Sequence, residues 1–210
     1  MRTPNLRCPG LLALGSMLAA CGGSAPEPPP PPAAEASPAA SAPSRAQAAP
    51  AADTLRSVVT SLAAGSCTTV SVDEEAGGST QECPGVGGYR VLVLDGDARM
   101  SITLRAPDGA EQPLELWTTV TGAFSSLADS AEWRVRGAGE DAAPVALIVE
   151  VRANESPEDP ERVTVYRAVA KVGSGGSCVT HRLDAAATRD QVLHAADSAA
   201  DTPCLAPLGG

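Results

Sequence analysis

Residues 22–52 confine any folded structure in this chain to the residues that follow them. This segment holds no aromatic and no large aliphatic side chain, and Pro28 to Pro32 form an unbroken proline run. A segment of this composition cannot bury enough apolar surface to offset the entropy of ordering it. We therefore expect a disordered, semi-stiff linker that reaches at most about 3.1 Å per residue and serves as a spacer. A proline-rich ligand for a partner domain is the alternative.

Residues 53–210 remain as one domain of about 150 residues, long enough to bury a core. Aromatic side chains are few, so the core must consist mostly of Val, Leu, Ile and Ala. The five aromatic residues are Tyr89, Trp117, Phe124, Trp133 and Tyr166.

Alternating apolar and polar residues, separated by turn sequences, indicate a mainly β domain. The expected strands are residues 67–72, 89–94, 100–105, 113–120, 131–136, 145–151, 162–172 and 178–183. The apolar run 145–151 is expected to be a central strand that forms a hairpin with 162–172. In 131–136, alternation predicts Trp133 and Val135 inward and Arg134 outward.

Three other segments complete the expected architecture. Residues 53–62 fit either a short helix capped by Asp53 or a strand, and residues 122–130 fit a short helix or a loop. The Ala-rich residues 185–200 are expected to form a helix capped by Asp184. The fold class is therefore an antiparallel sheet or sandwich of about seven strands with a C-terminal helix, or α+β if more helix forms.

The N-terminus carries Arg2 and Arg7, then a short apolar stretch, then Leu18-Ala19-Ala20-Cys21. These residues resemble the lipobox signal of bacterial lipoproteins. The resemblance implies that residues 1–20 are a signal peptide and that Cys21 is lipidated and becomes the first residue of the linker segment, 21–52. The alternative is an ordinary secretory signal cut elsewhere.

The same resemblance implies a location in the bacterial envelope. Gly22 and Gly23 follow the cysteine, and the absence of Asp there favours the outer membrane, facing the periplasm, over the inner membrane or the cell surface. Loss of the signal with its two arginines leaves 13 basic against 25 acidic side chains, a formal charge of −12. That charge argues against nucleic acid as a partner.

Cysteines supply a second constraint on the domain. With Cys8 removed and Cys21 lipidated, four remain: Cys67, Cys83, Cys178 and Cys204. An even number in an exported domain favours two disulfides, with three possible connectivities. Sequential pairing closes the shortest loops and would add roughly 3 kcal/mol per bond. No C-x-x-C spacing occurs, which disfavours redox exchange and zinc binding.

Residue types that could carry catalysis are sparse. His181 and His194 are the two imidazoles, and no H-E-x-x-H motif contains them. The carboxylate pairs Glu74/Glu75 and Asp95/Asp97 are explained by chance in so acidic a chain. The glycines of residues 83–89 lack the spacing of phosphate-binding loops and indicate a bend. We expect no catalytic residue, metal or cofactor.

Cys67, the acidic turn at 73–78, Cys83-Pro84-Gly85 and Gly88-Tyr89 together are similar to a group of uncharacterised bacterial envelope proteins. That resemblance implies an intact domain without an established activity. The expected function is a lipid-anchored envelope protein that binds or supports another component, such as an envelope protein or a glycan. A small periplasmic hydrolase, or an inhibitor of an envelope-attacking hydrolase, is the alternative.

Overall fold

The computed structural model describes residues 54–75, 77–139, 142–159 and 161–209. The predicted signal segment 1–20, the predicted lipidation site Cys21, the linker to residue 52 and the proposed cap Asp53 lie outside the described residues.

The described residues form a mainly β domain, as predicted, with ten strands rather than about seven. The strands are β1 (Leu55–Ser61), β2 (Thr68–Asp73), β3 (Gly78–Pro84), β4 (Arg90–Gly96), β5 (Arg99–Arg105), β6 (Glu111–Pro113), β7 (Phe124–Arg136), β8 (Ala143–Asn154), β9 (Thr164–Lys171) and β10 (Cys178–Asp184). The helices are α1 (Leu116–Thr119) and α2 (Arg189–Asp197), with 3-10 turns η1 (Ala64–Ser66) and η3 (Ala199–Asp201).

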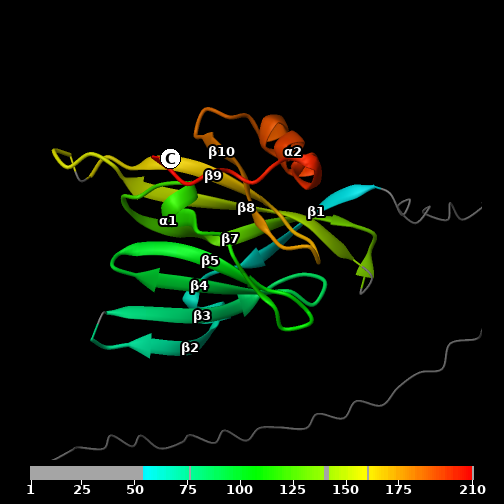
Figure 1. Cartoon of the computed structure of the whole chain (residues 1–210), viewed down its shortest axis with the longest axis horizontal. Helices are drawn as coiled ribbons and strands as arrows, with labels where there is room; N and C mark the ends of the chain where they lie inside the picture. The colour runs from blue at the N-terminus through cyan, green and yellow to red at the C-terminus, as the bar shows by residue number, and fades with distance from the viewer. Residues whose placement is uncertain (1–53, 76, 140–141, 160, 210) are drawn as a thin grey trace, which may run out of the picture. The chain divides into compact units, whose positions relative to one another are not determined.

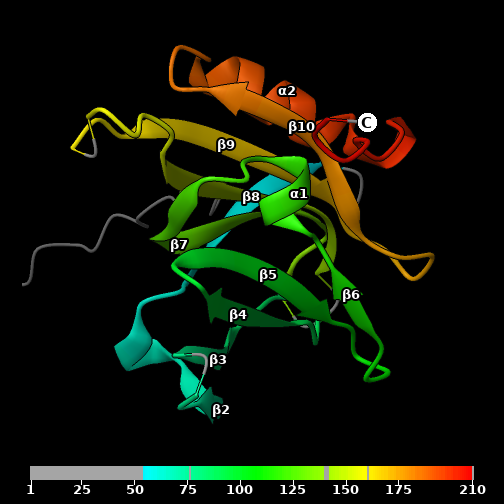
Figure 2. The ribbon, with the colours of Figure 1, turned by 60° about the vertical axis from the view of Figure 1, so that its left-hand side comes forward.

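The strands make one mixed sheet, ordered β10-β9-β8-β7-β5-β4-β3-β2, that is folded into a sandwich-like arrangement. Figure 2 shows β7 to β10 in one layer and β2 to β5 in the other. β7 links them: it pairs with β8 and with β1 in antiparallel fashion, and its start meets β5 in parallel at Arg99 and Ser125. The remaining pairings are antiparallel.

The main core lies between the layers. Val91 and Val93 of β4 and Ile102 and Leu104 of β5 are buried with the inward residues of β7 and β8. Trp133 is fully buried as predicted, and its indole nitrogen donates to the hydroxyl of Thr60 at 2.9 Å. This bond satisfies the one polar atom that a buried tryptophan brings.

A second apolar cluster forms where α2 covers the outer face of β8 and β9 (Figure 1). Ile148 and Val169 of the sheet meet Val192 and Ala196 of the helix. Because β8 is covered on both faces, its sequence reads as a continuous apolar run. The predicted hairpin of this strand with the segment 162–172 is confirmed, with Leu147 opposite Ala170.

Two segments differ from their predicted structure. Residues 113–120, expected as a strand, hold only the end of β6 and then α1, because Glu115 has a left-handed backbone (φ 52°) that turns the chain. Residues 122–130, expected as a helix or loop, belong largely to the long strand β7. The open choice at 53–62 is resolved as a strand, β1.

Two further corrections concern β3 and the helix, whereas Arg134 lies on its predicted face but is covered. β3 was not predicted as a strand. The helix begins after Thr188, not Asp184, because Thr188 and Gln191 form a reciprocal capping box. Arg134 lies on the face opposite Trp133, but α2 covers that face and leaves the residue 8% exposed.

Two disulfides, Cys67–Cys83 and Cys178–Cys204, give the sequential pairing. The first ties the segment before β2 to the end of β3, and the second ties β10 to the segment after α2. In the part of the chain that the structure describes, no helix has the length and apolar character needed to cross a bilayer.

Candidate functional site

Four of the five aromatic side chains divide between the core and one exposed site, and the fifth, Tyr166, is half-buried beside Arg182. Tyr89 and Trp133 are buried and lie near each other, with ring centroids 6.4 Å apart. Phe124, by contrast, is 54% exposed, and Trp117 is half-buried. Both rings lie near the turn between β4 and β5. We call this turn, α1, the start of β7 and the two recesses lined by Trp117 the aromatic site.

The turn between β4 and β5 is fixed to the start of β7. Asp97 and Ala98 are the two central residues of a tight hairpin turn, and both have positive φ. The carbonyl oxygen of Ala98 accepts a hydrogen bond from the backbone N–H of Ser125 at 2.9 Å. Arg99 donates from Nε to the carbonyl oxygen of Gly122 at 3.1 Å. These bonds hold Asp97, Arg99 and Phe124 in a defined arrangement.

Trp117 is held by its own short helix. The carboxylate of Glu115 accepts a hydrogen bond from the indole nitrogen of Trp117 at 2.7 Å. Leu116 is buried, and its backbone N–H donates to the hydroxyl of Ser101 on β5 at 3.1 Å. The indole therefore has a fixed orientation, and its ring is its remaining means of contact with a ligand.

Arg99 contacts Phe124 and lines one recess together with Trp117. Its guanidinium lies 5.5 Å from the centre of the Phe124 ring, within the range of a cation–π contact. It also forms an ion pair with Asp97 at 2.7 Å. The positive charge is therefore already matched by a carboxylate.

Two recesses are lined in part by Trp117. The larger, of about 550 Å³, is lined by Asp97, Arg99, Thr118, Trp117 and glycines. The smaller, of about 330 Å³, has a more polar lining from β2, β3 and β4: Ser71, Asp73, Gly78, Ser79, Thr80, Leu94, Asp95, Gly96 and Trp117. Both volumes are in the range of small-ligand sites. Trp117 and Gly96 line both recesses.

Unfavourable backbone geometry concentrates at the same place. Among the described residues, three that are not glycine have positive φ: Asp97, Ala98 and Glu115. Each costs about 1 kcal/mol or more, and such residues persist where the surrounding structure imposes them, often at functional sites. All three position side chains of the aromatic site.

The histidines also come together, in a different recess. His181 of β10 and His194 of α2 line a recess of about 590 Å³. Partial burial, and then the charge of His194, lower the pKa of His181 below its ordinary value. The nearby Ser198 hydroxyl donates to the carbonyl oxygen of His194 at 2.9 Å. Within the described residues, no three His, Cys, Asp or Glu side chains group as metal ligands.

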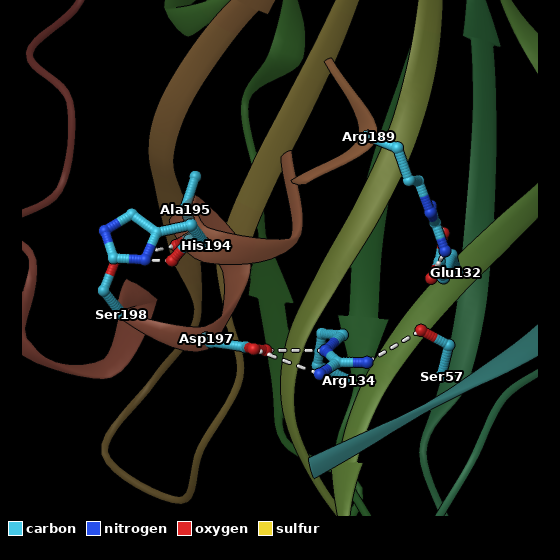
Figure 3. A network of polar contacts seen from close by, with 8 residues as sticks. All are labelled: Ser57, Glu132, Arg134, Arg189, His194, Ala195, Asp197 and Ser198. Carbon is cyan, nitrogen blue, oxygen red and sulfur yellow. Dashed lines mark hydrogen bonds and ion pairs between the residues drawn. The ribbon is translucent and has the colours of Figure 1, made fainter. Parts of the chain in front are cut away.

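A network of charged side chains holds α2 on the sheet (Figure 3). Arg134 donates two hydrogen bonds to Asp197, at 2.6 and 3.1 Å, and a third to the Ser57 hydroxyl at 2.8 Å. At the other end of the helix, Arg189 pairs with Glu132. A recess of about 320 Å³ beside this network is lined in part by Glu132 and Arg189. These charges are paired with one another, so we assign the network to helix docking.

Burial alone would raise the pKa of Glu132. Hydrogen bonds from Arg189 and Ser57 and the charges of Arg189 and Arg134 outweigh burial and hold that pKa below its ordinary value. The carboxylate is thus stabilised as an anion by the contacts that dock the helix.

Of the acidic pairs noted in the sequence, Asp95 and Asp97 both lie at the aromatic site. Glu74 and Glu75 lie in the exposed turn after β2. Sequence reasoning missed Trp117 and Phe124 as site residues, because an aromatic residue in a small domain is first assigned to the core. Comparisons with protein-family models, curated proteins and solved structures each found no significant match to the chain.

Proposed function

We propose that the chain is a lipid-anchored protein of the bacterial cell envelope and that residues 53–210 form a binding module without catalytic activity. The lipobox-like residues Leu18 to Cys21 support the anchor. The two disulfides support export to an oxidising compartment.

The observation that carries the binding function is the aromatic site. Trp117 and Phe124, two of the five aromatic residues of the chain, lie outside the core. Arg99 lies over the ring of Phe124 and lines one recess together with Trp117. Tryptophan and arginine are enriched among the residues that dominate binding energy at interfaces. The hydrogen bonds of Trp117 and Arg99 hold both side chains in place before a ligand arrives, which lowers the entropy cost of binding.

The anchor is tested by Cys21→Ala in the full-length chain expressed in a bacterium. We expect loss of palmitate labelling and release from the membrane fraction. Labelling that persists in this variant would refute the anchor.

Binding is tested by affinity capture from envelope extract with the full-length chain and with Trp117→Ala. We expect at least one component to be captured by the wild type and lost with the variant. Val59→Ala serves as the matched control, because Val59 is 65% exposed on β1 and does not line either recess of the aromatic site. Equal capture by all three proteins would exclude the aromatic site as the binding surface.

A further inference from the structure

The smaller recess beside Trp117 combines one aromatic ring with short polar side chains. The register places Ser71 opposite Thr80, and Thr80 opposite Leu94, so these three side chains share one face of the sheet. Asp73 lies two residues along β2 and shares this face as well. The recess therefore offers hydroxyl and carboxylate oxygens around an apolar floor.

The charge of the lining limits the ligand. Asp73, Asp95 and Asp97 contribute three carboxylates to the two recesses, and Arg99, the one cation in their lining, is paired with Asp97. The formal charge of this lining is negative, so it disfavours a phosphate, a sulfate or a uronic acid. A neutral ligand with many hydroxyl groups would donate to these oxygens without bringing a charge of its own.

Trp117 presents a ring face rather than a hydrogen-bond donor. Its indole N–H already donates to Glu115, so a ligand can use the indole mainly by packing against it. A sugar ring suits this geometry, because its C–H face is apolar and its rim carries hydroxyl groups. Because Gly96 and Trp117 line both recesses, the recesses are adjacent, and a chain of sugar units can extend from one into the other.

We propose that the aromatic site binds a neutral glycan chain, with a sugar ring stacked on Trp117 and hydroxyl groups held by Ser71, Thr80 and the carboxylates of the lining. This inference rests on the proposed binding function and specifies the ligand class.

A substitution at Gly96 tests the glycan proposal without removing any side-chain contact of the site. Gly96 lines both recesses, its φ lies outside the left-handed region, and a Cβ added there would meet no atom within 4 Å. Gly96→Leu should therefore fill the recesses while the fold is kept. Trp117→Ala removes the stacking surface instead, and Val59→Ala again serves as the control.

The experiment measures binding of the full-length chain in detergent to immobilised neutral oligosaccharides: the tetramers of cellulose, chitin, xylan, mannan and amylose. Polygalacturonate and tetralysine are the anionic and cationic probes. We expect at least one neutral tetramer to bind and both Gly96→Leu and Trp117→Ala to weaken it at least tenfold. Val59→Ala should bind like the wild type, and thermal melting should show all variants folded.

Binding of no neutral tetramer, or binding that both site variants leave unchanged, would overturn the glycan proposal. Trp117-dependent binding of tetralysine or polygalacturonate alone would also overturn it, while the binding module would stand. If envelope capture shows no Trp117-dependent component either, the proposed function fails as well.

Discussion

Replacing Asp197 by alanine should lower the free energy of unfolding by about 2 kcal/mol, because it leaves Arg134 without its bidentate partner beneath α2. The Arg134 side chain is 10% exposed and that of Asp197 37%. Breaking a fully buried pair typically costs about 3–5 kcal/mol. The partial exposure of Asp197 lets water reach Arg134 in the variant and reduces this cost. Asp197 is also an anion at the C-terminus of α2, where it opposes the helix dipole. Its removal therefore stabilises the folded state by about 0.3–1 kcal/mol, which reduces the net cost.

The other end of the same helix provides the comparison. Arg189 is 58% exposed, and the Glu132 that it would leave is 15% exposed but keeps its hydrogen bond with Ser57 and the nearby charge of Arg134. Arg189→Ala should therefore cost only about 1 kcal/mol or less. The double variant Arg134→Met, Asp197→Ala removes both charges and should recover most of the loss, since apolar replacements of a buried pair are often neutral.

Urea unfolding at neutral pH, with the disulfides intact, measures these differences from midpoint and slope. The reasoning is wrong if Asp197→Ala costs no more than Arg189→Ala. It is also wrong if the double variant is no more stable than Asp197→Ala alone.

Three further predictions use the same measurement. Ala98→Gly should raise the free energy of unfolding by about 0.5–1 kcal/mol, because glycine relieves the positive φ at this turn; unchanged or lower stability would contradict the assigned turn. Replacing both Cys178 and Cys204 by alanine, which opens a loop with a sequence separation of 26, should cost about 3.5 kcal/mol; a loss below about 1 kcal/mol would show that the bond constrains little. The pKa of His181 is lower in the folded state than its ordinary value of 6.5. As the pH falls through 6.5, the unfolded chain therefore binds a proton at His181 before the folded chain does, and the free energy of unfolding decreases. Urea midpoints measured from pH 7.5 to 5.5 should therefore fall more steeply for the wild type than for His181→Gln, and parallel curves would refute this.

Local sequence patterns predicted those strands in which burial on one or both faces determines the pattern of apolar residues. The hairpin of β8 and β9 follows from an apolar run that only a strand covered on both faces explains. Residues 113–120 were wrongly predicted as a strand because Leu114, Leu116 and Thr118 alternate as in a strand. The left-handed turn at Glu115 is imposed by packing against β5, which the local pattern does not encode. The start of α2 could have been read from Thr188 and Gln191, since their spacing is that of a capping box.

The aromatic site was less predictable for a different reason. The sequence shows Asp95 and Asp97 as a pair of carboxylates. Their place in a candidate ligand site depends on Trp117, which lies about 20 residues further along the chain. Only the fold brings β4, α1 and β7 together. Likewise, alternation placed Arg134 correctly on the outer face, but it could not reveal that a helix from the other end of the chain covers that face.

The participation of β7 in both layers affects how the domain comes apart. This strand pairs with β8 over most of its length, with β1 from Ser130 to Arg136, and with β5 at its start. Neither layer can lose its order without exposing a strand that the other layer also uses. The domain should therefore melt in one cooperative step, and a partly opened sandwich with one intact layer should not accumulate. Under proteolysis, this coupling would leave few intermediate states in which internal peptide bonds can be cut.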